Sequence, residues 1–229
     1  MFFFDPLYLI LALPGLLLGL WAQSRVRGTF NKYSKVRTMN GLTGAEVARR
    51  LLDSQGLMDV RIEETQGRLS DHYDPRDRVL RLSPDVYRTP SVAASGVAAH
   101  EMGHALQHSD SYKPLQIRSA IVPAVQFSSM LAPIIFIAGF LLGFTQLAWV
   151  GVGLFGLAVI FSLVTLPVEF DASKRAKALL SKSGILTSEE INGVDKVLDA
   201  AALTYVAAAI AAIGQLLYYV MLAGGGRRR

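Results

Sequence analysis

Residues 121–144 read IVPAVQFSSMLAPIIFIAGFLLGF, and residues 148–167 read AWVGVGLFGLAVIFSLVTLP. Neither stretch contains a charged side chain, and only a short uncharged segment around Thr145 and Gln146 separates them. Because a helix rises about 1.5 Å per residue, each is long enough, or nearly so, to cross a hydrocarbon core of about 30 Å. Together they predict a transmembrane hairpin, which returns the chain to the side of the membrane that it left.

Two further apolar segments, residues 6–22 and 200–226, flank this hairpin. The first could be a signal peptide, but residues 1–5 contain no basic side chain and the positive charges follow the apolar run instead. We therefore expect a retained anchor with its N-terminus outside. Hydrophobic residues make up 52% of the chain, which is too many for an ordinary soluble domain with such uncharged runs. The predicted fold class is mainly α, a multi-span helical membrane protein.

Lysine and arginine near the membrane ends predict the orientation, because short cytoplasmic loops are enriched in them. One side of the membrane carries Arg25, Arg27, Lys32, Lys35, Arg37, Lys113, Arg118, Lys174, Arg175, Lys177, Lys182 and Lys196. The other side carries Arg227, Arg228 and Arg229, which fits four complete spans poorly unless the last segment stops short of crossing. We expect the first side to be cytoplasmic. Its charges would face anionic lipid, so no nucleic-acid partner is needed to explain them.

The apolar segments divide the chain into five predicted parts. These are a first transmembrane helix (1–22), a polar insert (23–118), a transmembrane hairpin (119–167), a helix with a connector (168–199), and a fourth apolar helix with a basic tail (200–229). The insert is too short for more than one small domain, so we expect packing on the spans to complete it.

Local patterns predict a small α+β arrangement inside the insert. Thr43 and Glu46 form a capping box at the start of a helix that Gly56 ends. Residues 60–63 alternate as a short strand, while residues 67–70 and 78–82 flank a turn at 74–77, so we expect a hairpin. An edge strand there could bind an extended peptide by main-chain pairing, or it could only cover the core.

The run His100-Glu101-Met102-Gly103-His104 places two histidines one helical turn apart. On a helix, positions i and i+4 share a face about 6 Å apart, so both imidazoles can bind one zinc ion, and Glu101 turns toward the next coordination position as a base. Small residues that favour a helix precede the motif, with Thr89 or Ser91 as the candidate N-cap. The alternative is a histidine pair with a structural role in a buried helix.

A catalytic zinc site needs a third protein ligand and an open position for water. The chain has no cysteine, which fits a reducing compartment and excludes thiolate ligands. Glu169 is the best candidate, because it follows the third span on a helix that would continue toward the motif; the alternative is a solvated acid at a helix start. Asp171 lies about 200° around the helix from Glu169, so we expect it to support a ligand instead.

Other polar residues are candidates for supporting or substrate-binding roles. His108 would lie about 12 Å from His100 along a continuous helix, which is too far for one zinc ion, but it could orient substrate or cap the helix. His72 could approach the site from the hairpin, and Tyr73 or Tyr87 could donate a hydrogen bond to a developing oxyanion. Ordinary surface roles are the alternative for His72, Tyr73 and Tyr87.

The segments HEMGHALQH (100–108), LPVEFDAS (166–173) and AALTY (201–205) together resemble the bacterial membrane-bound neutral zinc metallopeptidases of the YugP type. The resemblance covers nearly the whole chain and implies a membrane gluzincin whose zincin-like insert carries the HExxH helix. It assigns His100, His104 and Glu169 as zinc ligands and Glu101 as catalytic base.

A more distant similarity is to HtpX-type membrane peptidases, in which an aspartate four residues after the ligand glutamate supports a histidine. Counting from Glu169, that position here holds Ser173, and the nearby acid is Asp171. The residue that supports the histidine is therefore expected to differ.

The sequence thus predicts a membrane-embedded metalloendopeptidase with one zinc ion, which hydrolyses membrane-proximal polypeptides in the bacterial cell membrane. The competing hypothesis is a non-catalytic membrane protein whose metal has a structural or transport role. Structural zinc prefers four closed protein ligands, whereas the sequence offers three good ligands and a glutamate suited to be a base, so the enzyme is favoured.

Overall fold

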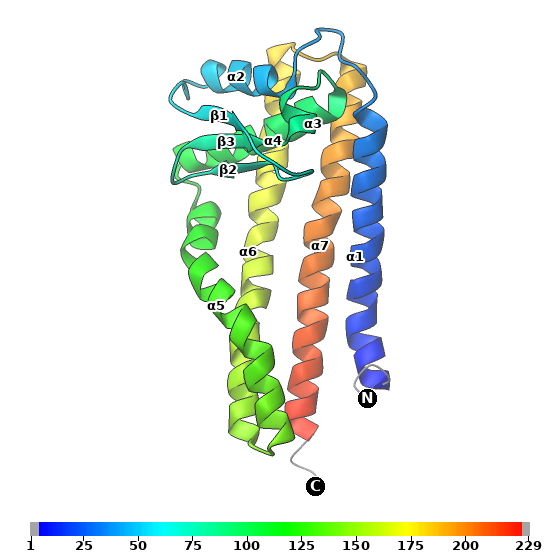
Figure 1. The fold of residues 1–229 in the computed structure, drawn as a ribbon, viewed down its shortest axis with the longest axis vertical. Coiled ribbons are helices and arrows are strands. Elements are labelled where there is room, and N and C mark those ends of the chain that lie inside the picture. Colours follow the sequence, from blue (N-terminus) through cyan, green and yellow to red (C-terminus); the bar gives the residue numbers. More distant parts are fainter. Residues whose placement is uncertain (1–4, 226–229) are drawn as a thin grey trace. The chain divides into compact units, whose positions relative to one another are not determined.

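The computed structural model describes residues 5–225, which form two compact units, each assembled from segments that are distant in sequence (Figure 1). The first unit consists of Met1–Gln23, Gln116–Pro167 and Leu203–Arg229. The second consists of Ser24–Leu115 and Val168–Ala202. We call them the helical unit and the mixed unit and describe each by itself.

Within residues 5–225, four helices are long and apolar enough to cross a membrane: α1 (Pro6–Tyr33), α5 (Lys113–Leu141), α6 (Thr145–Ser183) and α7 (Ser188–Gly225). The predicted fold class, a mainly α membrane protein with a small α+β insert, is confirmed. Helices α1, α6 and α7 continue past the apolar stretches, so each contributes residues to both units. The basic tail, residues 227–229, lies outside the described residues.

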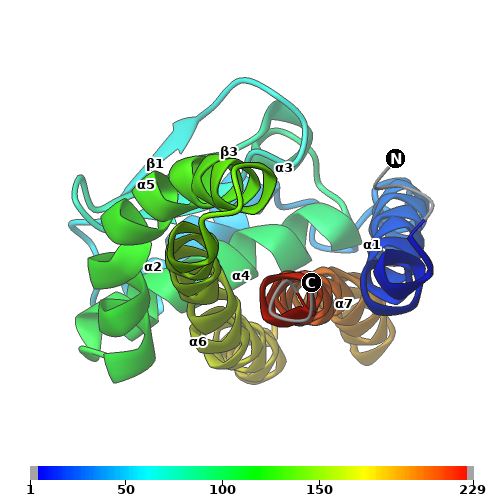
Figure 2. The same cartoon turned by 90° about the horizontal axis from the view of Figure 1, so that it is seen from below.

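Small residues allow the helices of the helical unit to approach closely. A Cβ atom added at Gly15 of α1 would lie 2.5 Å from the Cα atom of Ala211, so α1 and α7 lie side by side there (Figure 2). A Cβ atom at Gly151 of α6 would lie 2.6 Å from the backbone nitrogen of Phe136 in α5. Such close backbone contact is typical of helices that pack in lipid.

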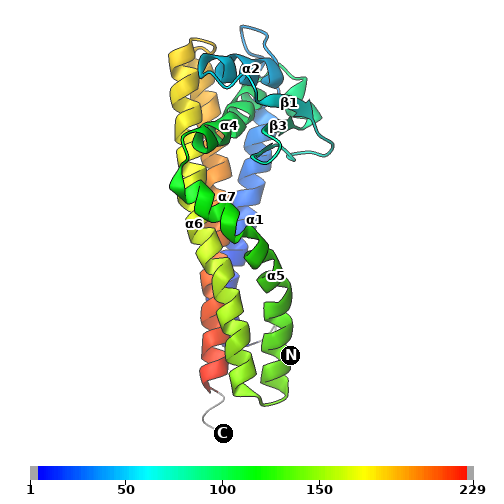
Figure 3. The ribbon, with the colours of Figure 1, turned by 90° about the vertical axis from the view of Figure 1, so that its left-hand side faces the viewer.

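Helices α5 and α6 form the expected hairpin (Figure 3). Its turn occupies residues 142–144, slightly earlier than predicted, and Thr145 is already the first residue of α6. Gly143 has a φ of +72°, a left-handed conformation that glycine adopts without strain and that commonly ends a helix.

The mixed unit contains a three-stranded sheet and three helices of its own. Its elements are α2 (Gly44–Ser54), β1 (Arg61–Glu64), β2 (His72–Asp74), β3 (Val79–Leu82), α3 (Pro84–Tyr87) and α4 (Val92–Ser109). The strand order is β1-β3-β2, with β1 parallel and β2 antiparallel to β3. Strands β1 and β2 are therefore the edges of this sheet.

The hairpin was predicted with its first arm at residues 67–70, and this part of the prediction is wrong. The arm is β2, where Tyr73 is paired with Leu80, while Gly67 and Leu69 have φ values of +102° and +55° and belong to a loop. Positive φ values are incompatible with a strand. The predicted strand at 60–63 is confirmed, shifted by one residue to β1.

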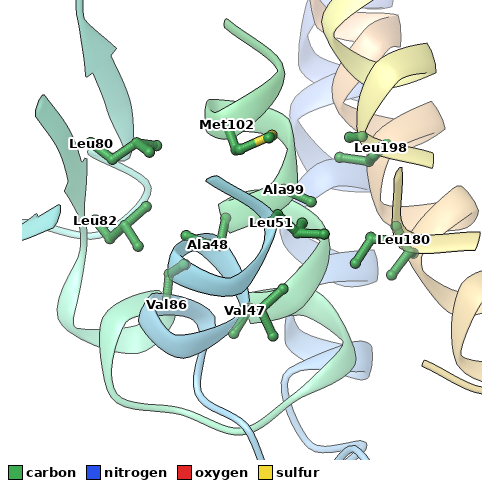
Figure 4. Packing of buried hydrophobic residues seen from close by; sticks show 14 of the residues in the cluster. Val47, Ala48, Leu51, Leu80, Leu82, Val86, Ala99, Met102, Leu180 and Leu198 are labelled. Atoms are coloured by element: carbon green, nitrogen blue, oxygen red, sulfur yellow. The ribbon is translucent and has the colours of Figure 1, made fainter. Parts of the chain in front are cut away.

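Apolar side chains pack α2, α4 and the sheet together (Figure 4). Leu51 of α2, Leu80 of β3, Met102 of α4 and Leu180 of α6 are all fully or almost fully buried. The predicted capping box of α2 is also present, since Thr43 and Glu46 bond each other's backbone nitrogen. This core packs α4 against residues 176–180 of α6.

Candidate metal centre

Helix α4 begins at a well-defined cap. The Ser91 hydroxyl accepts a hydrogen bond of 3.2 Å from the backbone nitrogen of Ala94, so Ser91 and not Thr89 is the N-cap. The alanines that follow, including Ala94 and Ala98, are fully buried. Their small side chains allow close packing on the neighbouring elements, and the motif therefore lies on a buried helix.

The two histidines of the motif converge with Glu169 of α6. The Nε2 atoms of His100 and His104 lie 3.2 and 3.5 Å from Oε2 of Glu169, and the potential ligand atoms of the three residues lie within 4.8 Å of one another. The histidine rings are nearly perpendicular, with centroids 4.9 Å apart. Two imidazole nitrogens and one carboxylate oxygen are a ligand set that suits zinc.

Gly103, inside the motif, allows this convergence. A Cβ atom at this position would lie 2.5 Å from the backbone carbonyl oxygen of Ala172 in α6. The backbones of α4 and α6 therefore touch between the two histidines, and only glycine leaves the necessary space. The sequence offered Gly103 as part of the motif but did not indicate this reason for it.

The Nδ1 atoms of both histidines have partners that sequence reasoning missed. Ser173 Oγ lies 3.1 Å from Nδ1 of His100, and Gln107 Oε1 lies 3.0 Å from Nδ1 of His104. The spacing is a usable signal in retrospect, because Gln107 is one helical turn after His104 and Ser173 is one turn after Glu169.

Asp171 lies near the site without joining the ligand atoms. One of its oxygens accepts hydrogen bonds from Gln107, at 2.9 Å, and from Arg175, at 2.6 Å. Arg175 is also paired with Asp110 at the end of α4. Asp171 can therefore act on His104 through Gln107.

A positive charge is favourable where the three side chains converge. Burial disfavours a charged imidazole, but the bond to Glu169, the negative charges of Glu101 and Glu169 and the contact with Gln107 together outweigh it, so the pKa of His104 is raised. If both histidines were neutral with a lone pair on Nε2, these lone pairs would face the Oε2 atom of Glu169, and the three groups would repel one another. A divalent metal ion removes this repulsion.

Glu101 takes no part in these bonds, although its charge acts on His104. Glu101 is 8% exposed, and within residues 5–225 its carboxylate has no hydrogen-bond partner. Asp71 is close enough for its charge to interact with that of Glu101, and burial raises the pKa of Asp71. The Asp71 carboxylate accepts hydrogen bonds from the backbone nitrogen and the hydroxyl of Ser83. Glu101 is thus a carboxylate beside the ligand set without a structural task of its own.

The remaining predicted residues lie apart from the ligand atoms. His108 Nδ1 lies 2.9 Å from the hydroxyl of Tyr73, which joins α4 to β2. His72 is exposed, and its Nδ1 lies 2.8 Å from the carbonyl oxygen of Ser70. Tyr87 of α3 packs against the hydrophobic core.

By its fold and its site, the protein belongs to the class of helical membrane proteins with a buried His-His-Glu centre. The chain is a member of the family described as "Putative neutral zinc metallopeptidase", which matches residues 8–224. It is 52% identical over 221 residues to the "Putative membrane protease YugP" of Bacillus subtilis (strain 168), an alignment that covers 96% of this chain and 98% of the relative. No solved structure matches the chain. The predicted resemblance to the YugP-type family is confirmed.

Proposed function

We propose that the protein is a zinc metalloendopeptidase that hydrolyses peptide bonds in membrane-proximal polypeptides. The observation that carries the proposal is the convergence of His100, His104 and Glu169 from two segments, with the carboxylate of Glu101 near His104 and without a hydrogen-bond partner among residues 5–225. These residues fit a single zinc ion with three protein ligands, which leaves a coordination position open.

The chemistry divides between the ion and the chain. Zinc, when bound, supplies Lewis acidity that makes water nucleophilic near neutral pH and polarises the scissile carbonyl. Glu101 takes the proton of the attacking water and delivers it to the leaving amine. Because water is the nucleophile, no covalent acyl-enzyme forms.

We also propose a role in substrate binding for the residues of β2. Strand β2 is an edge strand that contacts α4, so an extended peptide could pair with its main chain. Tyr73 on β2, oriented by His108, could donate a hydrogen bond to the developing oxyanion, and exposed His72 could contact the substrate.

We further propose that the site is on the cytoplasmic side of the membrane. The basic residues near the membrane ends support this orientation, because they concentrate on the side that carries residues 23–118. A reporter fused near Lys35 should behave as cytoplasmic. Labelling of that loop by an impermeant reagent in intact cells would contradict the orientation.

The alternative is a metal with a structural or transport role. A closed structural site would need a fourth protein ligand, and both candidates are otherwise engaged: His108 bonds Tyr73, and Asp171 bonds Gln107 and Arg175. A purely structural site would also give no task to the Glu101 carboxylate. These observations favour catalysis.

The test compares metal content and cleavage of an unfolded generic protein for the purified full chain and for Glu101→Gln. The variant should keep stoichiometric zinc and lose turnover, because it retains the ligands and lacks the base. Glu189→Gln, the same change at an exposed position, should retain both. A Glu101→Gln protein that cleaves at the unaltered rate would overturn the proposed mechanism, and an unaltered protein without zinc would overturn the proposed cofactor.

A further inference from the structure

Gln107 is a fully buried side chain whose three hydrogen bonds all end at the metal centre or beside it. Its Oε1 lies 3.0 Å from Nδ1 of His104, and its Nε2 donates to the Val168 carbonyl oxygen at 2.7 Å and to Asp171 Oδ2 at 2.9 Å. We propose that Gln107 is the positioning residue of the site: it fixes which nitrogen of His104 faces the metal and holds the segment of Glu169 in place. The proposal rests on the proposed metal site.

The orientation of the Gln107 amide follows from its partners. A main-chain carbonyl and a carboxylate can only accept hydrogen bonds, so the amino group of Gln107 must face Val168 and Asp171. Its carbonyl oxygen then faces His104 and can only accept. His104 must therefore carry its proton on Nδ1, which directs the Nε2 lone pair toward Glu169 and the metal.

His100 lacks such a constraint. Its Nδ1 is bonded to the hydroxyl of Ser173, and a hydroxyl group can donate or accept by rotating. Ser173 can therefore follow either tautomer of His100. Of the two contacts, only that of Gln107 dictates the state of its histidine.

The same side chain joins the two helices that supply the ligands. Gln107 and His104 lie on α4, whereas Val168 immediately precedes Glu169 on α6. The bond to Asp171 extends this link, since Arg175 binds Asp171 and Asp110 and so returns from α6 to α4. Gln107 thus controls both the orientation of one ligand and the position of another.

Zinc affinity and the visible absorption of the cobalt-substituted full chain test this role. Gln107→Met keeps a similar volume without hydrogen bonds and should lower zinc affinity by about 10-fold to 100-fold, as do other losses of residues that orient ligands. Gln107→Glu should be weaker still, because its carboxylate faces Asp171 and the Val168 carbonyl. Both should change the cobalt spectrum. Gln55→Met, at an exposed position, should match the unaltered protein.

A paired change separates positioning from packing. In the double variant Gln107→Glu with Asp171→Asn, the amide nitrogen at 171 can donate to the carboxylate at 107, whose other oxygen still accepts from His104. The recovery is partial, because this nitrogen no longer accepts from Arg175 and the Val168 carbonyl stays without its donor. Zinc affinity should recover by about 10-fold relative to Gln107→Glu alone, together with the cobalt spectrum. If the double variant regains thermal stability without regaining affinity, Gln107 is a packing residue and the proposal is wrong.

The tautomer can also be measured without any change to the site. Nitrogen NMR of the histidine-labelled, zinc-loaded protein should show His104 protonated on Nδ1, with His72 and His108 assigned by substitution. A Gln107→Met protein with unaltered affinity and cobalt spectrum would overturn the proposal while the metal site itself stands. Protonation of His104 on Nε2 would overturn the proposal and also exclude Nε2 as the ligand atom of His104. An unaltered protein that binds no zinc would instead refute the proposed function.

Discussion

The two units of this protein place their apolar side chains in opposite ways. The mixed unit buries Leu51, Leu80 and Met102 in a continuous core, as a domain in water does. The helical unit leaves large apolar side chains such as Ile10 and Leu142 more than 60% exposed and packs its helices through glycine. An apolar surface of this kind is stable only in an apolar solvent, so the two units are built for different surroundings.

The comparison extends to polar groups. In the mixed unit, buried His100, His104, Gln107 and Glu169 engage one another. In the helical unit, the hydroxyl of buried Ser128 donates a hydrogen bond to the carbonyl oxygen of Val125 in its own helix. Chemistry is therefore expected to depend on the mixed unit, while changes in the helical unit should act on packing alone.

Loss of a metal ligand should give the largest effect. Loss of a residue that only orients a ligand lowers metal affinity by at most about 100-fold. We expect a larger loss of zinc affinity for each of His100→Ala, His104→Ala and Glu169→Ala, with activity falling to background. Metal analysis after dialysis measures this. Ser162→Ala in the helical unit should keep its zinc. Stoichiometric zinc in Glu169→Ala would remove Glu169 from the ligand set.

Shortening a leucine should destabilise the protein strongly in the core of the mixed unit and only weakly on the exposed apolar surface of the helical unit. Leu51→Ala should destabilise the mixed unit by about 2–5 kcal/mol, because it leaves a cavity. Leu163→Ala, at a residue that is 46% exposed in the helical unit, should change stability by less than about 0.5 kcal/mol. Denaturant titration of the solubilised protein compares them. Equal effects would contradict the distinction between buried core and exposed apolar surface.

Glycine-to-alanine changes should show a smaller difference between the two units. Gly103→Ala should cost about 1–3 kcal/mol, because its methyl group collides with the Ala172 carbonyl, and zinc affinity should fall as α4 and α6 separate. Gly15→Ala should destabilise the helical unit through its collision with Ala211 and leave zinc affinity unchanged. Gly153→Ala meets no atom within 4 Å and is the control. Normal zinc binding by Gly103→Ala would show that the backbones can separate without disturbing the site.

The smallest predicted effect concerns the start of α4. Ser91→Ala removes the bond to the backbone nitrogen of Ala94 and should lower stability by about 1 kcal/mol. Thermal unfolding measures it, with Ser162→Ala as the control, since that hydroxyl only bonds the carbonyl of Val159 within its own helix. A loss of several kcal/mol would mean that Ser91 has a role beyond capping.

The sequence by itself determined the features that depend on neighbouring residues. Uncharged runs predicted the apolar helices, the pair Thr43 and Glu46 predicted the start of α2, and the spacing of His100 and His104 predicted their shared face. Each follows from the period of one helix or from one local hydrogen bond. Such signals are complete within a few residues.

Only the tertiary structure decided which segments meet. The parallel pairing of β1 with β3, the contact of Gly103 with Ala172, and the bonds of Gln107 to Val168 and Asp171 all join residues that are distant in the chain or lie on different elements. No local pattern encodes the partner of a buried amide, because its hydrogen bonds are chosen by the packing of whole helices. The orientation of the predicted ligands therefore depends on contacts that form only when α4 and α6 come together.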